Sequence, residues 1–263
     1  CLTGDVHNSI NSEEQKYYKK NEIELANRYL SIANQYDIKS TLFFTGKSVK
    51  ENKSHFAQII NYNNLEIGGH TWNAFRPKWL HKLFYLVTNS KYGPKFYQKY
   101  DIKKTIDILS TSIDKKIISW RTHSYSSNYI TKDILIKNNI KIISDEVSPN
   151  EFTYKYDDFG LLNLPINVMP DHEHIYHGGR TKKHVKNLID NGWTDAFTSK
   201  SFEIKKYFSI IKKQIMDIEK QKGIATLLLH PSCMKVCDDF RQFEKLCQWI
   251  NNNNIKTIWC KDL

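Results

Sequence analysis

Acidic, basic and histidine side chains follow short apolar runs at several widely separated points in this sequence. The first case is LTGDVH near the amino terminus, where Asp5 and His7 come directly after an apolar run. The same pattern recurs after LEIGG, KIISW, IKIIS and IATLLL, and gives His70, Arg121, His123, Asp145 and His230. One histidine in such a place is ordinary, but the repetition predicts that these side chains meet in one site.

These residue types suit a particular chemistry. Imidazole nitrogens bind divalent transition metals at about 2.0–2.1 Å, and a carboxylate offsets the positive charge. A metal with an open position lowers the pKa of a water molecule and polarises a carbonyl group. A neighbouring carboxylate acts as the base toward that water, and a protonated histidine serves the leaving group. The residues therefore indicate metal-assisted hydrolysis of an amide or an ester.

The elements that must position these residues alternate between short β-rich runs and amphipathic helices. About seven such units predict a mainly parallel sheet with helices outside. Seven or eight units in 263 residues favour a distorted (β/α) barrel, in which all strand carboxyl ends share one rim. An open doubly wound sheet is the alternative, although no GxGxxG or GxxxxGK[ST] loop follows a strand. The expected strands are the opening run and residues 40–46, 65–70, 116–121, 140–145, 161–167, 224–230 and 255–259.

We expect residues 1–263 to form a single domain, with the aromatic-rich stretch 75–100 as an insertion or a helical lid. The net charge of +11 is spread over lysines on expected helix surfaces, and no nucleic-acid-binding signature is present. No apolar run reaches the ~20 residues of a membrane helix. Five cysteines without paired CxxC spacing argue against a disulfide framework and predict a reduced, cytoplasmic protein. The abrupt start on a strand is consistent with a missing initiator methionine or short leader.

The order of these motifs resembles that of the polysaccharide deacetylases (NodB-homology proteins, carbohydrate esterase family 4). That family carries an early Asp motif, then H[ST]xxH, RxP and a late LxH. The corresponding segments here are LTGDVH, GGHTWNAF, WRTHSY and LLLHP. Together with PDHEHIYHG, they look like a branch associated with lipopolysaccharide O-antigen biosynthesis. The resemblance implies a distorted (β/α) barrel and a divalent metal, most often zinc.

The resemblance also implies roles for individual residues. Asp5 would be the general base, held by Arg121, and His230 would be the general acid for the departing amine or alcohol. His70 matches the first histidine of H[ST]xxH and would be a metal ligand. His7 stands where several family members place a second acid that binds the metal. A backbone N–H near Ser124 would complete an oxyanion hole.

Two departures from the family pattern concern the metal site. Ala74 stands where the second histidine of H[ST]xxH is expected, and His123 replaces the proline of RxP. The replacement ligand is His123, His172 or His174, and we favour His172 or His174 because PDHEHIYH is dense in histidines and acids. The expected function is removal of an acetyl or formyl group from an amino sugar of a surface-glycan precursor. The alternatives are a degenerate glycan-binding protein and another C–N hydrolase, such as a ureide hydrolase.

Overall fold

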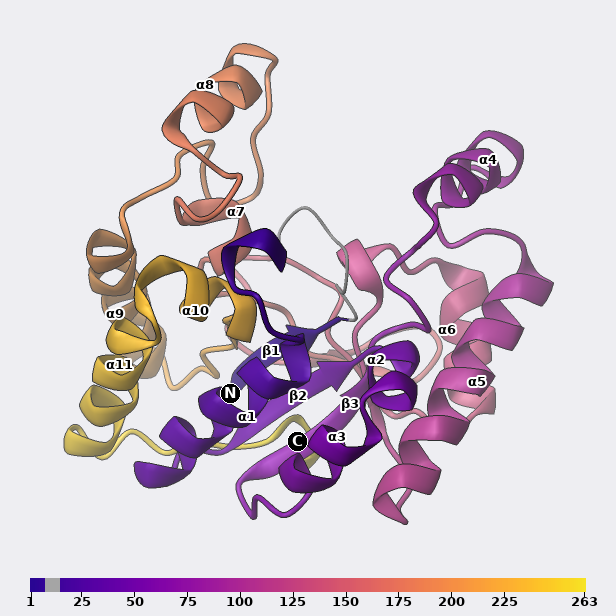
Figure 1. Cartoon of the computed structure of the whole chain (residues 1–263), viewed down its shortest axis with the longest axis horizontal. Helices are drawn as coiled ribbons and strands as arrows, with labels where there is room; N and C mark the ends of the chain where they lie inside the picture. The colour runs from indigo at the N-terminus through magenta and orange to yellow at the C-terminus, as the bar shows by residue number, and fades with distance from the viewer. Residues whose placement is uncertain (8–14) are drawn as a thin grey trace.

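The computed structural model describes residues 1–7 and 15–263 and has a curled, mainly parallel sheet surrounded by helices (Figure 1). The eight strands lie in the order β6-β7-β5-β4-β3-β2-β1-β8, and only the β6–β7 pair is antiparallel. The predicted α/β barrel-like class is confirmed. The strands are β1 (Leu2–Val6), β2 (Ser40–Phe44), β3 (Leu65–Gly69), β4 (Ser119–Trp120), β5 (Ile142–Ile143), β6 (Lys155–Tyr156), β7 (Leu162–Asn163) and β8 (Leu227–Leu228).

Helices cover the outer side of the sheet, while α4 and α8 project from the body at the top of Figure 1. None of the described helices has the length and apolar character needed to cross a bilayer. The α-helices are α1 (Glu22–Gln35), α2 (Gly46–Glu51), α3 (Lys53–Ile59), α4 (Lys78–Thr88), α5 (Lys95–Ile113), α6 (Tyr129–Lys137), α7 (Asp171–His174), α8 (Lys182–Asp190), α9 (Ile204–Lys220), α10 (Pro231–Asp238) and α11 (Arg241–Asn252). Short 3₁₀ turns cover Gln15–Tyr17, His123–Tyr125 and Cys260–Asp262.

The strand order distinguishes a distorted (β/α) barrel from an open doubly wound sheet, the two folds that the sequence allowed. From β1 to β5 each strand pairs with the next one along the chain, without the order reversal of a doubly wound sheet. The side chain of Asn167, beyond β7, donates to the Ile224 carbonyl at 2.9 Å and accepts from the Thr226 N–H at 2.8 Å. The Val168 N–H also donates to the Thr226 carbonyl at 3.3 Å. These bonds link the β7 side of the sheet to the segment before β8, so the sheet curls like a distorted barrel.

Local sequence signals explain several of these elements. Asn21 caps α1, because its side chain accepts from the Glu24 N–H at 2.8 Å. The predicted apolar face of this helix, which includes Ile23 and Leu30, is fully buried.

The predicted strand at 255–259 is wrong: this segment is not in the sheet. Its polar contacts run instead from the Lys39 N–H to Thr257 Oγ1 and from Trp259 Nε1 to the Asn64 carbonyl.

Residues 75–100, expected as an insertion or lid, form α4 and the start of α5. Helix α4 turns one side toward α5, where the Phe84 and Tyr97 rings lie 4.8 Å apart. Its other side is exposed, with Leu86 81% accessible. The assignment of this stretch as a lid, and of residues 1–263 as one domain, stays a prediction.

The paired glycines at the end of β3 are needed by the neighbouring rings. A Cβ atom on Gly68 would lie 2.5 Å from the Phe43 ring, and one on Gly69 would lie 2.4 Å from the Trp120 ring. Both distances are far below van der Waals contact. Trp120 is fully buried and so has little room to move. The glycines therefore let β3 pass close to two core rings just before His70.

We expect Gly69→Ala to lower the free energy of unfolding by about 1–3 kcal/mol, because the new methyl group overpacks the core against Trp120. Urea unfolding followed by circular dichroism measures this change. Gly179→Ala is the matched control: a Cβ there meets no atom within 4 Å, so its unfolding midpoint should not fall below that of the wild type. Equal midpoints for both variants would contradict the packing argument.

Candidate active site

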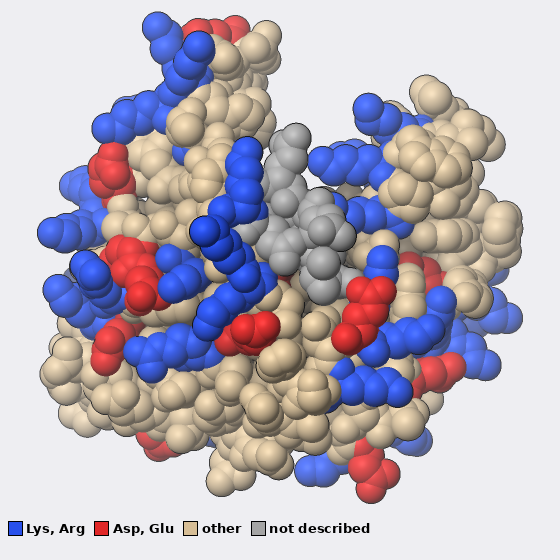
Figure 2. Space-filling view, viewed as in Figure 1, with Lys and Arg blue, Asp and Glu red and all other residues tan. Residues whose placement is uncertain are grey.

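A pocket of about 280 Å³ opens at the carboxyl ends of β1, β3, β4 and β8. Figure 2 shows the surface hollowed between the projecting α4 and α8 segments, with basic side chains spread over the visible face. The pocket is lined by residues from distant parts of the chain, including Asp5, His7, His123 and His230. Parallel strands bring their carboxyl ends to one edge, which explains this convergence.

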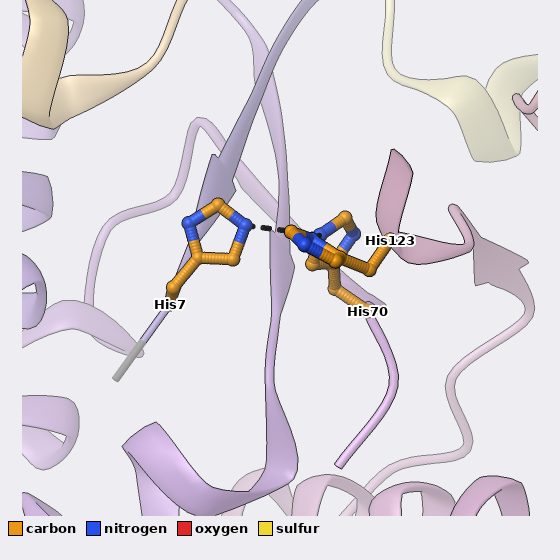
Figure 3. Close-up of side chains that lie close together, drawn as sticks. All are labelled: His7, His70 and His123. Carbon is orange, nitrogen blue, oxygen red and sulfur yellow. Dashed lines mark hydrogen bonds between the residues drawn. The ribbon is translucent and has the colours of Figure 1, made fainter. Parts of the chain in front are cut away.

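Three histidine rings meet at the floor of this region (Figure 3). The Nε2 atom of His70 lies 3.1 Å from Nε2 of His7 and 3.2 Å from Nδ1 of His123. The ligand atoms of all three residues lie within 4.8 Å of one another. His7 follows β1, His70 follows β3 and His123 starts the turn after β4, so the ends of three strands of one sheet supply one ring each.

The three nitrogens fit a bound divalent cation. Two nitrogens at 2.0–2.1 Å from a tetrahedral zinc ion lie about 3.3–3.4 Å apart, close to the 3.1 and 3.2 Å observed here. A proton on His70 Nε2 satisfies only one of its two nitrogen contacts. A cation would accept all three lone pairs at once. Donor type and spacing therefore both suit a zinc-like ion.

Burial keeps two of these imidazoles in the form that binds metal. His70 is 1% exposed, and burial lowers its pKa to about 3. Burial likewise lowers the pKa of His123 well below its usual value, and the neighbouring His7 and His70 add to the effect. A neutral imidazole presents a lone pair, which is what a metal requires.

Glu22, at the start of α1, orients His7 and was not singled out from the sequence. Its Oε2 atom lies 3.3 Å from Nδ1 of His7 and accepts the backbone N–H of His7 at 2.7 Å. A carboxylate behind a ligating histidine fixes the ring and raises the basicity of its other nitrogen. A glutamate in the first turn of a helix is common, because its negative charge interacts favourably with the helix dipole. The sequence position of Glu22 therefore gave no functional signal.

Asp5 and Arg121 form a buried ion pair beside the histidines. Arg121 Nη1 donates to Asp5 Oδ1 at 3.0 Å, and Arg121 is fully buried. Two further guanidinium nitrogens donate to Ser144, one to its carbonyl at 2.9 Å and one to its hydroxyl at 2.8 Å. Burial alone would raise the pKa of Asp5, but the surrounding histidines and the Arg121 guanidinium lower it further than burial raises it. Asp5 is thus held as a carboxylate, with Oδ2 3.8 Å from His70 Nε2.

His230 lies on the other side of Asp5 and is held by Asp171. Its Nδ1 atom lies 2.7 Å from Asp171 Oδ1, and its backbone N–H donates to Asp171 Oδ2 at 2.6 Å. Its Nε2 atom lies 3.8 Å from Asp5 Oδ2. Burial opposes protonation of His230, but the charges of Asp171 and Asp5 outweigh it and raise its pKa to about 10. A protonated imidazole is therefore favoured at His230, which lines the pocket.

Of the three candidate replacement ligands, His123 lies in the three-histidine group. His172 and His174, the two candidates in α7, lie outside it. His174 is fully buried, with Nε2 2.8 Å from Asp195 and Nδ1 2.9 Å from the Lys200 carbonyl. His172 lines the pocket, but its Nδ1 atom is near Cys233. Two residues along a helix are separated by a rotation of about 200° around its axis, so the side chains of His172 and His174 point in nearly opposite directions.

Three other predicted positions have defined places. Ala74 lines the pocket without a donor atom. Ser124 also lines it and has a left-handed backbone (φ 53°), as does Tyr125, a conformation that costs non-glycine residues about 1–3 kcal/mol each. The Tyr125 N–H donates to the Thr122 carbonyl at 2.9 Å, so this N–H is used within the turn. Asp145 lies behind this turn, where it accepts the Thr122 N–H at 2.6 Å.

Known proteins share this fold. The family model described as polysaccharide deacetylase matches residues 20–142. A structure from Mycobacterium smegmatis assigned to the polysaccharide deacetylases is 14% identical, with a TM-score of 0.66 over 99% of this chain and 85% of that one. A similarly assigned Pseudomonas aeruginosa structure is 11% identical, with a TM-score of 0.62 over 94% and 71%.

A third similar structure is Puue allantoinase, which is 12% identical with a TM-score of 0.62 over 95% of this chain and 72% of that one. No curated protein matches this sequence significantly. The identities to the solved structures are low, so those structures show a shared fold. The family model covers less than half of the chain, and the structural neighbours add the shared fold over nearly its whole length.

Proposed function

We propose that this polysaccharide deacetylase-like chain is a metal-dependent hydrolase that removes an N-acetyl, or alternatively an N-formyl, group from an amino sugar. The carrying observation is the set of three imidazole nitrogens spaced for one cation, beside an ionised Asp5 and a protonated His230. We further propose a surface polysaccharide or lipopolysaccharide precursor as the substrate, and the cytoplasm as the compartment. The resemblance of LTGDVH, GGHTWNAF and PDHEHIYHG supports the substrate, and the five cysteines without paired spacing support the compartment.

His7, His70 and His123 would hold the metal, which polarises the amide carbonyl and lowers the pKa of a water molecule when bound. Asp5, fixed by Arg121, accepts a proton from the attacking water. The N–H of Ser124 would stabilise the developing oxyanion. His230 donates its Nε2 proton to the departing amine, and Asp171 holds the ring through Nδ1. Base and acid therefore lie on adjacent sides of one pocket.

The same geometry favours a hydrolase over a degenerate glycan-binding protein. Loss of the ligand at Ala74 would leave only two ligands if nothing replaced it. His123 supplies a third nitrogen at 3.2 Å from His70, and both catalytic candidates keep their partners. A binding protein needs neither a buried carboxylate–guanidinium pair nor a carboxylate behind His230.

We expect chelation to abolish acyl release and zinc to restore it. The tag-free protein is dialysed against a chelator, and acetate and formate release is measured from N-acylated amino-sugar oligosaccharides and nucleotide-linked amino sugars. Metal content is measured on the same samples. A protein that binds no metal and releases no acid from this panel would contradict the proposal. Allantoin belongs in the panel, because turnover of this ureide alone would indicate the other C–N hydrolase.

We expect His70→Ala to lose the metal of the three-histidine group and to lower turnover to the level of the chelated enzyme. His70 contacts both other ligands, so its loss leaves two donors on opposite sides of a gap. Elemental analysis and activity assays measure the two effects. His55→Ala, which changes a half-buried histidine on α3 outside the pocket, is the matched control and should keep both properties. Full activity in folded His70→Ala would exclude this site.

A further inference from the structure

A second group of metal-ligating side chains lies beside the pocket, built from His172, His177 and Cys233. Cys233 Sγ lies 3.7 Å from His172 Nδ1 and 3.8 Å from His177 Nε2. The ligand atoms of all three residues lie within 4.8 Å of one another. The group shares no residue with His7, His70 and His123.

Defined elements hold these three side chains. His172 is in α7, and Cys233 is in the first turn of α10, where it is 2% exposed. His177 lies between them in a loop that is pinned by the Arg180 N–H donating to the His177 carbonyl at 2.7 Å. His177 Nε2 also lies 3.1 Å from the His172 carbonyl, a contact that a proton can satisfy when no metal is present.

The spacing matches metal coordination. A thiolate at about 2.3 Å and an imidazole nitrogen at 2.0–2.1 Å from a tetrahedral ion are separated by about 3.6 Å. The observed sulfur–nitrogen distances of 3.7 and 3.8 Å are close to that value. One thiolate with two imidazoles is a donor set typical of zinc and unlike that of magnesium or calcium, which take oxygen ligands.

We propose that His172, His177 and Cys233 bind a second transition-metal ion of the zinc class, separate from the ion of the three-histidine group. This ion joins the α7 segment to α10. Asp171 precedes His172, and His230 precedes the first residue of α10, so the cross-link holds the Asp171–His230 pair together. The second ion is thus a structural clamp behind the proton donor.

Cobalt(II) substitution tests this second site, because a cysteine thiolate bound to cobalt gives a near-ultraviolet charge-transfer band that imidazole ligands do not give. We expect wild-type protein to bind two equivalents and to show the band. Cys233→Ser and His177→Gln should each lose one equivalent and lose or strongly weaken the band. Cys237→Ser is the matched control, since this thiol lies one turn along α10 and outside the group; it should keep both equivalents.

His70→Ala separates this proposal from the proposed function. This variant should lose one equivalent of cobalt and keep the thiolate band, because the second group contains none of its ligands. Folded wild-type protein that binds a single equivalent without the band would overturn the second site while leaving the hydrolase proposal intact. The same conclusion follows if folded Cys233→Ser and His177→Gln both keep the band at full strength.

Discussion

Replacing Asp5 with asparagine is expected to lower kcat by a factor of about 10²–10⁴ while the metal content stays unchanged. Asparagine lacks the charge and basicity needed to take a proton from water, but its amide oxygen can still accept the Arg121 N–H bond. Asp5 also does not belong to the three-histidine group. Acyl release by the zinc-loaded variant, with elemental analysis of the same sample, measures both quantities.

The Asp5→Asn result needs a check on folding, because the variant leaves the buried Arg121 charge without a counter-charge. Removal of one partner from a buried pair destabilises proteins by about 3–5 kcal/mol. We therefore expect a lower thermal midpoint, and the assays must be run well below it. Ser144→Ala weakens the hold on Arg121 but keeps the base, so it should lower stability with a far smaller loss of kcat. Wild-type kcat in folded, metal-loaded Asp5→Asn would rule Asp5 out as the base.

Replacing Asp171 with asparagine is expected to move the high-pH limb of the kcat profile to lower pH by about 1–3 units. In the wild type, the neighbouring carboxylates raise the pKa of His230 to about 10 against the effect of burial. Loss of the Asp171 charge lowers that pKa, so the proton that serves the leaving group is lost at lower pH. A cation bound nearby lowers the pKa in both proteins, and the direction of the difference stays the same.

The pH profile distinguishes a positioning role of Asp171 from a purely structural one. A variant that is merely less stable loses activity at all pH values below its unfolding transition, without a shift of the limb. Asp195→Asn is the matched control, because Asp195 holds His174 in a similar way but outside the pocket. It should leave the limb where it is. An unshifted limb in folded Asp171→Asn would show that Asp171 does not act through His230.

The same pair has a consequence for stability. A histidine whose folded pKa is raised adds its full stabilisation below the unfolded pKa of about 6.5 and loses it as pH rises through the folded value. For His230 that window extends from about 6.5 to about 10. Wild-type protein should therefore lose more unfolding free energy across this window than Asp171→Asn.

The sequence by itself determined the fold class and most of the elements. Alternation of buried runs with amphipathic helices is a local signal, and it predicted the parallel sheet and the apolar face of α1. It also predicted that strand ends would bring Asp5, His70, Arg121 and His230 together, because parallel strands end on a common edge. The segment at 255–259 shows the limit of this reasoning: a β-rich run forms a strand only if its backbone pairs with the sheet, and this one contacts Lys39 and Asn64 instead.

Only the tertiary structure decided which side chains meet at the proposed metal site. In the sequence, Ala74 stands where the family pattern has a metal-binding histidine, and the density of histidines in PDHEHIYH favoured His172 or His174 as its replacement. The parallel pairing of β3 with β4 instead brings His123 against His70, while the rotation along α7 turns His174 toward Asp195. Glu22 behind His7 and Asp171 behind His230 were equally hidden, since the partners are 15 and 59 residues apart. Residue types and strand ends are local properties, whereas the direction of each side chain depends on how distant elements pack.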